Sequence, residues 1–286
     1  MNVIDTSPGI LTAYDSGRFG IERWKAYIDA WVPGAKELCL QDMKECLDAG
    51  FSFEEDFLPV LECVPADALK REETIRLFRE ITGQLEDKIA TRFHRTVDAD
   101  IILYLGLCNG AGWVTGIGDR TVVLLGIEKI MELNWCNRDD MNGMIIHEMG
   151  HVFQSQYGLF ELNTESISDR FLWQLFTEGV AMVFEQEVIG DPGYYHQDIN
   201  GWGKWCESNL ARIAKAFSED MFRMTNENQR YFGDWAEFEG HGDVGYCLGA
   251  RFVRFLMGSD SFENVILYDI EKVRKGYEQF VDEVCV

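Results

Sequence analysis

The sequence contains the run His147-Glu148-Met149-Gly150-His151, an HExxH pattern. On an α-helix, positions four apart lie on the same face, so His147 and His151 can aim two imidazoles at one metal ion. Glu148 follows the first histidine, and its carboxylate can reach a water beside that ion and act as a general base. The spacing therefore predicts metal-assisted hydrolysis on a helical scaffold.

The residues around this pattern are mostly apolar, as a helix that buries two histidines requires. The apolar run extends from Met141 to Gln154, and either Asp139 or Asp140 is expected to cap the start of the helix. The alternative is a core or surface helix whose histidines have nothing to do with a metal.

A catalytic zinc takes three protein ligands and keeps one position for water, so a third ligand is needed. The HExxHxxGxxH subclass is excluded, because Gln154 and Tyr157 stand where it needs glycine and histidine. A second helix is predicted over Asp169–Glu185, with Glu178 in its middle among apolar residues. A buried carboxylate needs a partner, and a metal ion supplies one. The alternative is that Glu178 reaches solvent from a helix boundary.

The segment Thr177 to Ala181, reading Thr-Glu-Gly-Val-Ala, resembles the third-ligand helix of the gluzincin metallopeptidases, in their aminopeptidase branch. Glu185, seven residues after Glu178, matches the second acidic position of that branch, which orients a histidine. The alternative for Glu185 is a solvated helix charge. No Gly-Ala-Met-Glu-Asn-like exopeptidase motif lies upstream.

A late element, Gly245-Tyr-Cys-Leu-Gly249, is similar to one in small bacterial proteins described as predicted zinc proteases. The resemblance covers roughly residues 100 to 257. It implies a zincin-like α+β fold, mainly helical, with a small mixed sheet and an HExxH active-site helix. It also implies one Zn²⁺ per chain, held by His147, His151 and Glu178.

Peptide hydrolysis develops negative charge on the carbonyl oxygen, which a tyrosine or histidine donor can stabilise. Tyr246 and His241 are the two candidates for this role, and the resemblance favours Tyr246. Asp243 is the alternative third metal ligand, because its surroundings partly match proteases that use aspartate there. His94 and His196 have no ligand spacing and are expected to be surface or packing residues.

Composition narrows the functional class. With 286 residues and 47% hydrophobic residues the chain can build a substantial core, and a net charge of −23 disfavours nucleic acid and anionic membranes as partners. No signal peptide and no membrane-spanning segment are visible in the sequence. The eight cysteines form no CxxC pair, which indicates reduced thiols and a cytoplasmic location.

The first 95 residues are expected to form a helical lobe, and residues 96–286 a zincin-like catalytic domain; the alternative is one continuous domain. Two further segments are predicted as strands, and Ala111–Gly116 as the strand that pairs with an extended substrate, with a simple hairpin as the alternative. The expected helices are Ile21–Trp31, Ala35–Ala49, Ala68–Phe93, Trp205–Phe222 and Gly249–Met257, and the two strands are Ile101–Leu105 and Arg120–Leu125.

These features predict a zinc metallopeptidase that acts on a peptide or protein substrate. Three other functions stay open at this point: a non-proteolytic metal-binding protein, a zinc hydrolase of a non-peptide amide, and a helical interaction protein without metal. The sequence carries no signal of substrate specificity or of oligomeric state.

Overall fold

The computed structural model of the chain describes residues 1–233 and 235–285. Its contacts divide the chain into two compact units, Met1–Glu148 and Met149–Val286, and the division falls within helix α7 (Arg138–Tyr157). The architecture combines many helices with a small mixed sheet, as an α+β fold does. The domain boundary predicted near residue 95 stays a prediction, because the contact division does not test it.

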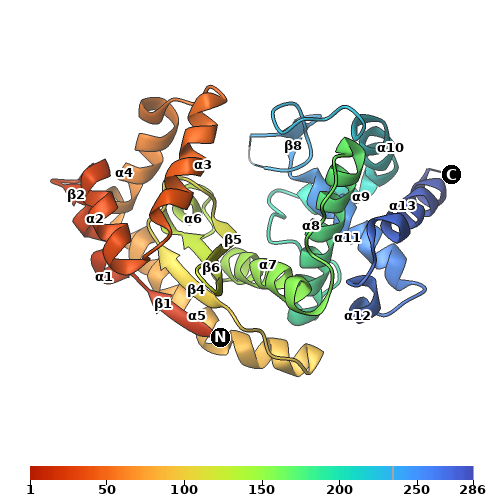
Figure 1. Cartoon of the computed structure of the whole chain (residues 1–286), viewed down its shortest axis with the longest axis horizontal. Coiled ribbons are helices and arrows are strands. Elements are labelled where there is room, and N and C mark those ends of the chain that lie inside the picture. The colour runs from red at the N-terminus through yellow and green to blue at the C-terminus, as the bar shows by residue number, and fades with distance from the viewer. Residues whose placement is uncertain (234, 286) are drawn as a thin grey trace. The chain divides into compact units, whose positions relative to one another are not determined.

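The first unit contains a four-stranded sheet and a small hairpin, with helices packed around them (Figure 1). Its strands are β1 (Asn2–Asp5), β2 (Tyr14–Asp15), β3 (Arg18–Phe19), β4 (Asp100–Tyr104), β5 (Gly112–Ile117) and β6 (Arg120–Gly126). Its helices, besides the start of α7, are α1 (Ser7–Ile10), η1 (Leu11–Ala13), α2 (Ile21–Trp31), α3 (Lys36–Asp48), η2 (Phe53–Phe57), α4 (Leu58–Ala66), α5 (Ala68–Phe93) and α6 (Ile127–Glu132).

The sheet has the strand order β1-β4-β6-β5, in which β1, β4 and β6 run parallel and β5 is antiparallel at one edge. The backbone N–H of Gly126 donates to the carbonyl of Ala111 at 3.1 Å. Because hydrogen-bonded pairs alternate along an antiparallel ladder, the N–H and C=O groups of Gly112, Val114 and Gly116 face away from β6. The predicted edge strand is therefore present, and it is also one arm of a hairpin with β6.

Most local predictions for this unit are confirmed. Helices α2 and α5 have the predicted bounds, and α3 ends at Asp48, just before Gly50 with its left-handed φ of 107°. The central strands β4 and β6 lie within one residue of their predicted ends. Both are almost wholly buried, which explains why they read as continuous apolar runs rather than alternating ones.

The second unit is built mainly from helices that follow α7. They are α8 (Ile167–Ile189), α9 (Trp202–Ser208), α10 (Leu210–Asp220), α11 (Val244–Met257), α12 (Phe262–Val265) and α13 (Ile270–Val284), with a hairpin of β7 (Glu237–Phe238) and β8 (His241–Gly242). The single helix predicted over Trp205–Phe222 is wrong, because the chain breaks at Asn209. The side-chain amide of Asn209 donates to the carbonyl of Trp205 at 2.7 Å and competes with the backbone there.

Helix α8 crosses both α7 and α11 at residues that have little or no side chain. A Cβ atom on Gly179 of α8 would lie 2.3 Å from the carbonyl oxygen of Gly249 on α11, and Figure 1 shows these two helices side by side. A Cβ atom on Gly150 of α7 would lie 2.8 Å from the Cα atom of Ala181 on α8. The three backbones can approach this closely only because these side chains are absent or small.

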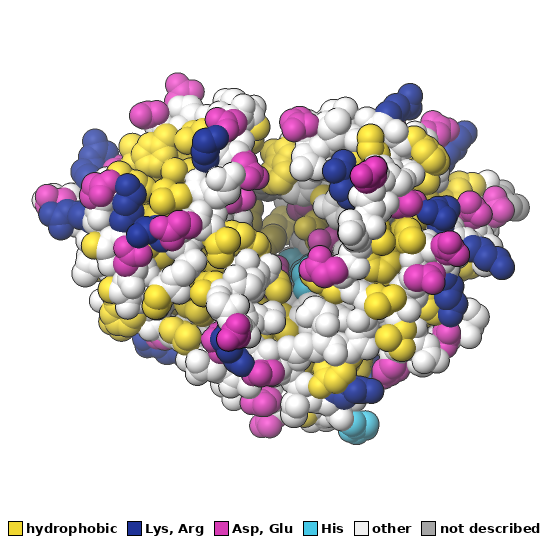
Figure 2. Space-filling model, viewed as in Figure 1, with side chains coloured by type: hydrophobic (Ala, Val, Ile, Leu, Met, Phe, Trp, Pro, Cys, Tyr) yellow, Lys and Arg dark blue, Asp and Glu magenta, His cyan; other side chains and the backbone are white. Residues whose placement is uncertain are grey.

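On the visible face, charged side chains are spread out rather than collected in one place (Figure 2). Figure 2 shows acidic side chains spread over the visible face of each unit, with basic and apolar side chains among them. Within the described residues, no helix is both long enough and apolar enough to span a bilayer. Each of the eight cysteines is a free thiol, as the sequence predicts.

A carboxyl group of the first unit is buried without contact with solvent. Glu128, in the first turn of α6, is 0% exposed, and its two oxygens accept the backbone N–H groups of Gly106 at 3.0 Å and Cys108 at 3.2 Å. Burial raises the pKa of Glu128 to about 7, although these hydrogen bonds and the nearby Lys129 lower it. The other titratable groups near this carboxyl are Tyr14, Tyr27, Cys39, Cys63, Tyr104 and Cys108.

This burial predicts a pH dependence of stability. Since the usual pKa of a glutamate is 4.5 and that of Glu128 is about 7, the folded protein holds more protons than the unfolded chain between these values. The stability contributed by the group is fully present below pH 4.5. It falls by about 3 kcal/mol as the pH rises from 4.5 through 7. Urea unfolding of the wild type and of Glu128→Gln from pH 4.5 to 8 measures this loss. The free energy of unfolding of the wild type should fall relative to that of Glu128→Gln as the pH rises. A difference that does not change with pH would contradict the raised pKa of Glu128.

The helix crossing generates a second prediction. Gly249→Ala should lower the free energy of unfolding by about 1–3 kcal/mol, because the added methyl group meets backbone atoms that have no room to move. Gly83→Ala is the matched control, since that position lies inside α5 with no atom within 4 Å of its added Cβ. The control should stabilise the protein by about 0.5–1 kcal/mol. Equal effects of the two substitutions in urea titrations would contradict the close approach.

Candidate metal centre

Helix α7 carries the HExxH pattern, and it begins at a cap that the sequence prediction assigned to the wrong residue. Asn137, and neither Asp139 nor Asp140, lies before the first helical residue, and its side-chain oxygen accepts the backbone N–H of Asp140 at 3.0 Å. The two aspartates occupy the first turn, where their negative charge interacts favourably with the helix dipole. The resulting helix is continuous through the motif, so His147 and His151 lie one turn apart on it.

The second unit brings His151 of α7 to Glu178 of α8. The Nε2 atom of His151 lies 3.3 Å from the Oε2 atom of Glu178, and their side chains are 11% and 19% exposed. This meeting follows from the helix crossing described above, because Gly150 precedes His151 and Ala181 lies one turn after Glu178. Because its side chain is 19% exposed and it stands in the middle of α8, Glu178 is neither deeply buried nor at a helix boundary.

The geometry of these residues fits a divalent metal ion. His147, His151 and Glu178 each offer one ligand atom, and these atoms all lie within 4.8 Å of one another. Two ligands of a tetrahedral zinc ion stand about 3.3–3.4 Å apart, which is the separation between His151 and Glu178. Two imidazoles and one carboxylate are also a donor set that zinc takes in catalytic sites.

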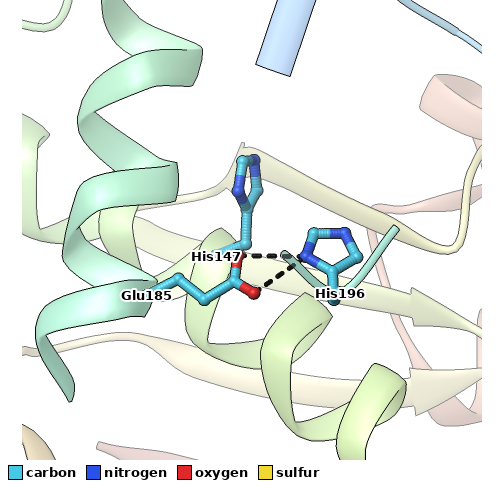
Figure 3. Close-up of side chains that lie close together, drawn as sticks. All are labelled: His147, Glu185 and His196. Carbon is cyan, nitrogen blue, oxygen red and sulfur yellow. Dashed lines mark hydrogen bonds and ion pairs between the residues drawn. The ribbon is translucent and has the colours of Figure 1, made fainter. Parts of the chain in front are cut away.

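A second cluster is more deeply buried and includes Glu185 and His196, which the sequence does not predict as metal ligands. The carboxylate of Glu185 on α8 contacts the Nδ1 atom of His196 at 3.0 and 3.1 Å, and Figure 3 shows both contacts together with His147. Glu185 is 0% exposed, so its interpretation as a solvated charge is wrong. His147, Glu185 and His196 also have ligand atoms within 4.8 Å of one another.

The second cluster contains a direct contact between a carboxylate and an imidazole. Glu185 and His196 stand at hydrogen-bond distance, and both carboxylate oxygens share one ring nitrogen, so the two groups bind each other directly. A carboxylate close to a metal-binding histidine can fix the tautomer and the orientation of its ring. His196 offsets the cost of burying the Glu185 carboxylate.

The motif glutamate lies against the edge strand of the first unit. A Cβ atom on Gly112 of β5 would lie 2.5 Å from both the Cγ and the Oε1 atoms of Glu148. Glycine at this position leaves the space that the Glu148 side chain occupies. The open edge of β5 and the predicted general base are thus direct neighbours within one unit.

The three residues of the late segment have different surroundings. Tyr246, in the first turn of α11, packs edge-to-face on Phe232 with ring centroids 5.6 Å apart, and it is half-buried. His241 stacks flat on Trp205 at 3.6 Å. Asp243 accepts the backbone N–H of Gly233 at 3.1 Å, and among the described residues it belongs to neither candidate metal group.

The residue that the sequence reasoning missed is His196. It lies in the loop after α8, where no helical or strand period relates it to the motif, and it was expected to be a surface or packing residue. The structure buries it to 4% exposure against Glu185. One sequence signal is the pair of aromatic residues before it, Tyr194 and Tyr195, which indicates that part of this loop packs against the core.

In comparisons with known proteins, no protein-family model, no curated protein and no solved structure matches this chain.

The metal centre predicts a difference between two carboxylate substitutions. Elemental analysis of protein purified without a histidine tag should find about one zinc per chain in the wild type. Glu178→Ala should lose that zinc, because it removes one of three ligands. Asp243→Ala should retain it, since that side chain accepts the backbone N–H of Gly233 and lies outside both candidate ligand groups. Loss of zinc in Asp243→Ala alone would move the third ligand to the late segment.

Proposed function

We propose that this protein is a zinc-dependent peptidase that hydrolyses peptide bonds in extended chains. The observation that carries the proposal is the convergence of His147, His151 and Glu178, with Glu148 on the same helix. The intact Glu148 favours a hydrolase over a metal-binding protein without hydrolytic activity. The proposal extends the resemblance to the gluzincins that the sequence motifs indicate.

The proposed chemistry assigns one task to each residue. His147, His151 and Glu178 would hold the zinc ion, which when bound supplies a Lewis acid and lowers the pKa of a coordinated water. Glu148 accepts a proton from the attacking water and returns it to the departing amine. Glu185 keeps the His147 ring oriented during the reaction.

The open edge of β5 supports a peptide as the substrate. Gly112, Val114 and Gly116 direct their backbone N–H and C=O groups away from β6, and an extended chain can pair with such an edge. Two of these three residues are glycines, so few side chains stand between the edge and an approaching backbone. Main-chain pairing of this kind has little dependence on the sequence of the substrate.

Tyr246 is the group we assign to the developing oxyanion. It lies one turn before Gly249 on α11, and Gly249 contacts Gly179, the neighbour of Glu178. Tyr246 is thus one helical turn away from the point where α11 contacts the ligand-bearing turn of α8. His241 is a weaker candidate, because one face of its ring is covered by Trp205.

The test of the proposed function is Glu148→Gln. This variant should keep its zinc, because Glu148 is not among the ligands, and its turnover of a mixed peptide library should fall by about 10²–10⁴-fold. Asp139→Asn, an exposed carboxylate of the same helix, is the matched control and should turn over at the wild-type rate. Mass spectrometry of the digested library measures cleavage directly.

Other outcomes distinguish the alternatives. Wild-type turnover retained by Glu148→Gln would sink the assigned role of that residue. A zinc-loaded wild type that cleaves no peptide would favour a non-catalytic metal-binding protein, or a hydrolase of a different amide. A wild type that binds no zinc would reject the metallopeptidase altogether.

A further inference from the structure

The loop between β4 and β5, residues 105–111, leads directly into the proposed substrate edge, and a buried carboxylate holds it from inside the first unit. The two oxygens of Glu128 accept the N–H groups of Gly106 and Cys108. A Cβ atom on Gly106 would lie 2.5 Å from Oε1 of Glu128. The loop backbone therefore wraps closely around this carboxylate.

The surroundings of Glu128 are mostly apolar, so burying its carboxylate there costs free energy. The side chain has no exposed surface and no ion pair within hydrogen-bond distance among the described residues, and its neighbours are phenols, thiols and backbone. Burying a carboxylate in such surroundings is expensive unless hydrogen bonds compensate. Here the compensating donors belong to the loop itself, so the loop and the carboxylate stabilise each other.

The loop residues that Glu128 binds lie close in sequence to the edge strand β5. Three residues, Asn109 to Ala111, separate the N–H of Cys108 from the first residue of β5. Gly110 has a φ of 145°, and the carbonyl of Ala111 accepts the N–H of Gly126. The next residue, Gly112, is the one whose Cβ position is limited by Glu148. A shift of the loop would therefore be passed to β5 where it meets the general base.

The opposite side of the loop is fixed by a separate set of contacts. The side chain of Asn109 accepts the N–H of Leu107 at 2.9 Å, and its amide donates to the carbonyl of Cys39 at 3.0 Å and to Asp42 at 2.8 Å. These contacts attach the loop to α3. The loop is thus held from two sides, by Glu128 within the unit and by Asn109 from α3.

We propose that Glu128 is a positioning residue, which fixes the β4–β5 loop so that the open edge of β5 presents its backbone to a substrate beside Glu148. This inference rests on the proposed peptidase function for its consequence in catalysis. Its structural half, the hold on the loop and strand, is independent of any reaction. The two halves can therefore be tested separately.

The experiment compares the wild type with Glu128→Gln at pH 8, above the pKa of about 7 of Glu128. Glutamine has the same shape but replaces one acceptor oxygen by an amide donor, which cannot accept a backbone N–H. Amide hydrogen exchange over residues 105–117 should become about tenfold faster, while β1 and β4 keep their protection. KM for an extended peptide should rise about tenfold with little change in kcat, because a binding contact is lost equally in the ground and transition states.

Two further variants make the result decisive. Glu132→Gln, an exposed position on the same helix, should change neither exchange nor KM. Asn109→Ala releases the loop from its other side and should act in the same direction as Glu128→Gln, so it provides the test if the glutamine variant does not fold.

Unchanged exchange over residues 105–117 would overturn the inference, whatever the activity. Faster exchange with an unchanged KM would also overturn it, because β5 would then not serve the substrate. A wild type without peptide turnover rejects the proposed function instead, and hydrogen exchange still decides whether Glu128 holds the strand.

Discussion

Three helix backbones come into near contact at Gly150–Ala181 and at Gly179–Gly249, and the candidate metal centre depends on this close approach. Side chains of ordinary size would push α8 away from α7 and α11, and a displacement of a few tenths of an ångström is enough to spoil a ligand set. The Gly-x-Ala part of the third-ligand motif is thus explained by packing. In the proposed site Glu178 is the third metal ligand, and the small residues after it allow α8 to approach its neighbours closely.

Four glutamates illustrate how surroundings decide what a carboxylate does. Glu178 lies 3.3 Å from a nitrogen of His151 and belongs with it to a candidate metal group, and Glu185 contacts His196 at 3.0 Å. Glu128 accepts backbone N–H groups in an apolar interior, and Glu148 lies partly exposed beside a glycine of the edge strand. One residue type thus occupies positions suited to ligation, orientation, structural support and proton transfer.

The sequence predicted those parts of the structure that local periodicity controls. The bounds of α2 and α5, the central strands, the edge strand and the pairing of His151 with Glu178 all follow from spacing, apolar runs and motif composition. What it could not reveal depends on contacts between distant residues. His196 belongs to an irregular loop, and Glu128 looks like an ordinary acidic residue in a first helical turn. The break at Asn209 comes from a side chain that competes with its own helix.

Two cysteines of the first unit, the buried Cys39 and the half-buried Cys63, have a practical consequence. Burial raises the pKa of Cys39 to about 12 and that of Cys63 to about 11, so at neutral pH almost none of either thiol is in its reactive thiolate form. Cys285, in contrast, is exposed near the end of the chain. Alkylating reagents should therefore modify Cys285 in the folded protein, and they should reach the buried Cys39 only when the first unit opens. The chain thus contains its own chemical reporter of local unfolding, without any introduced label.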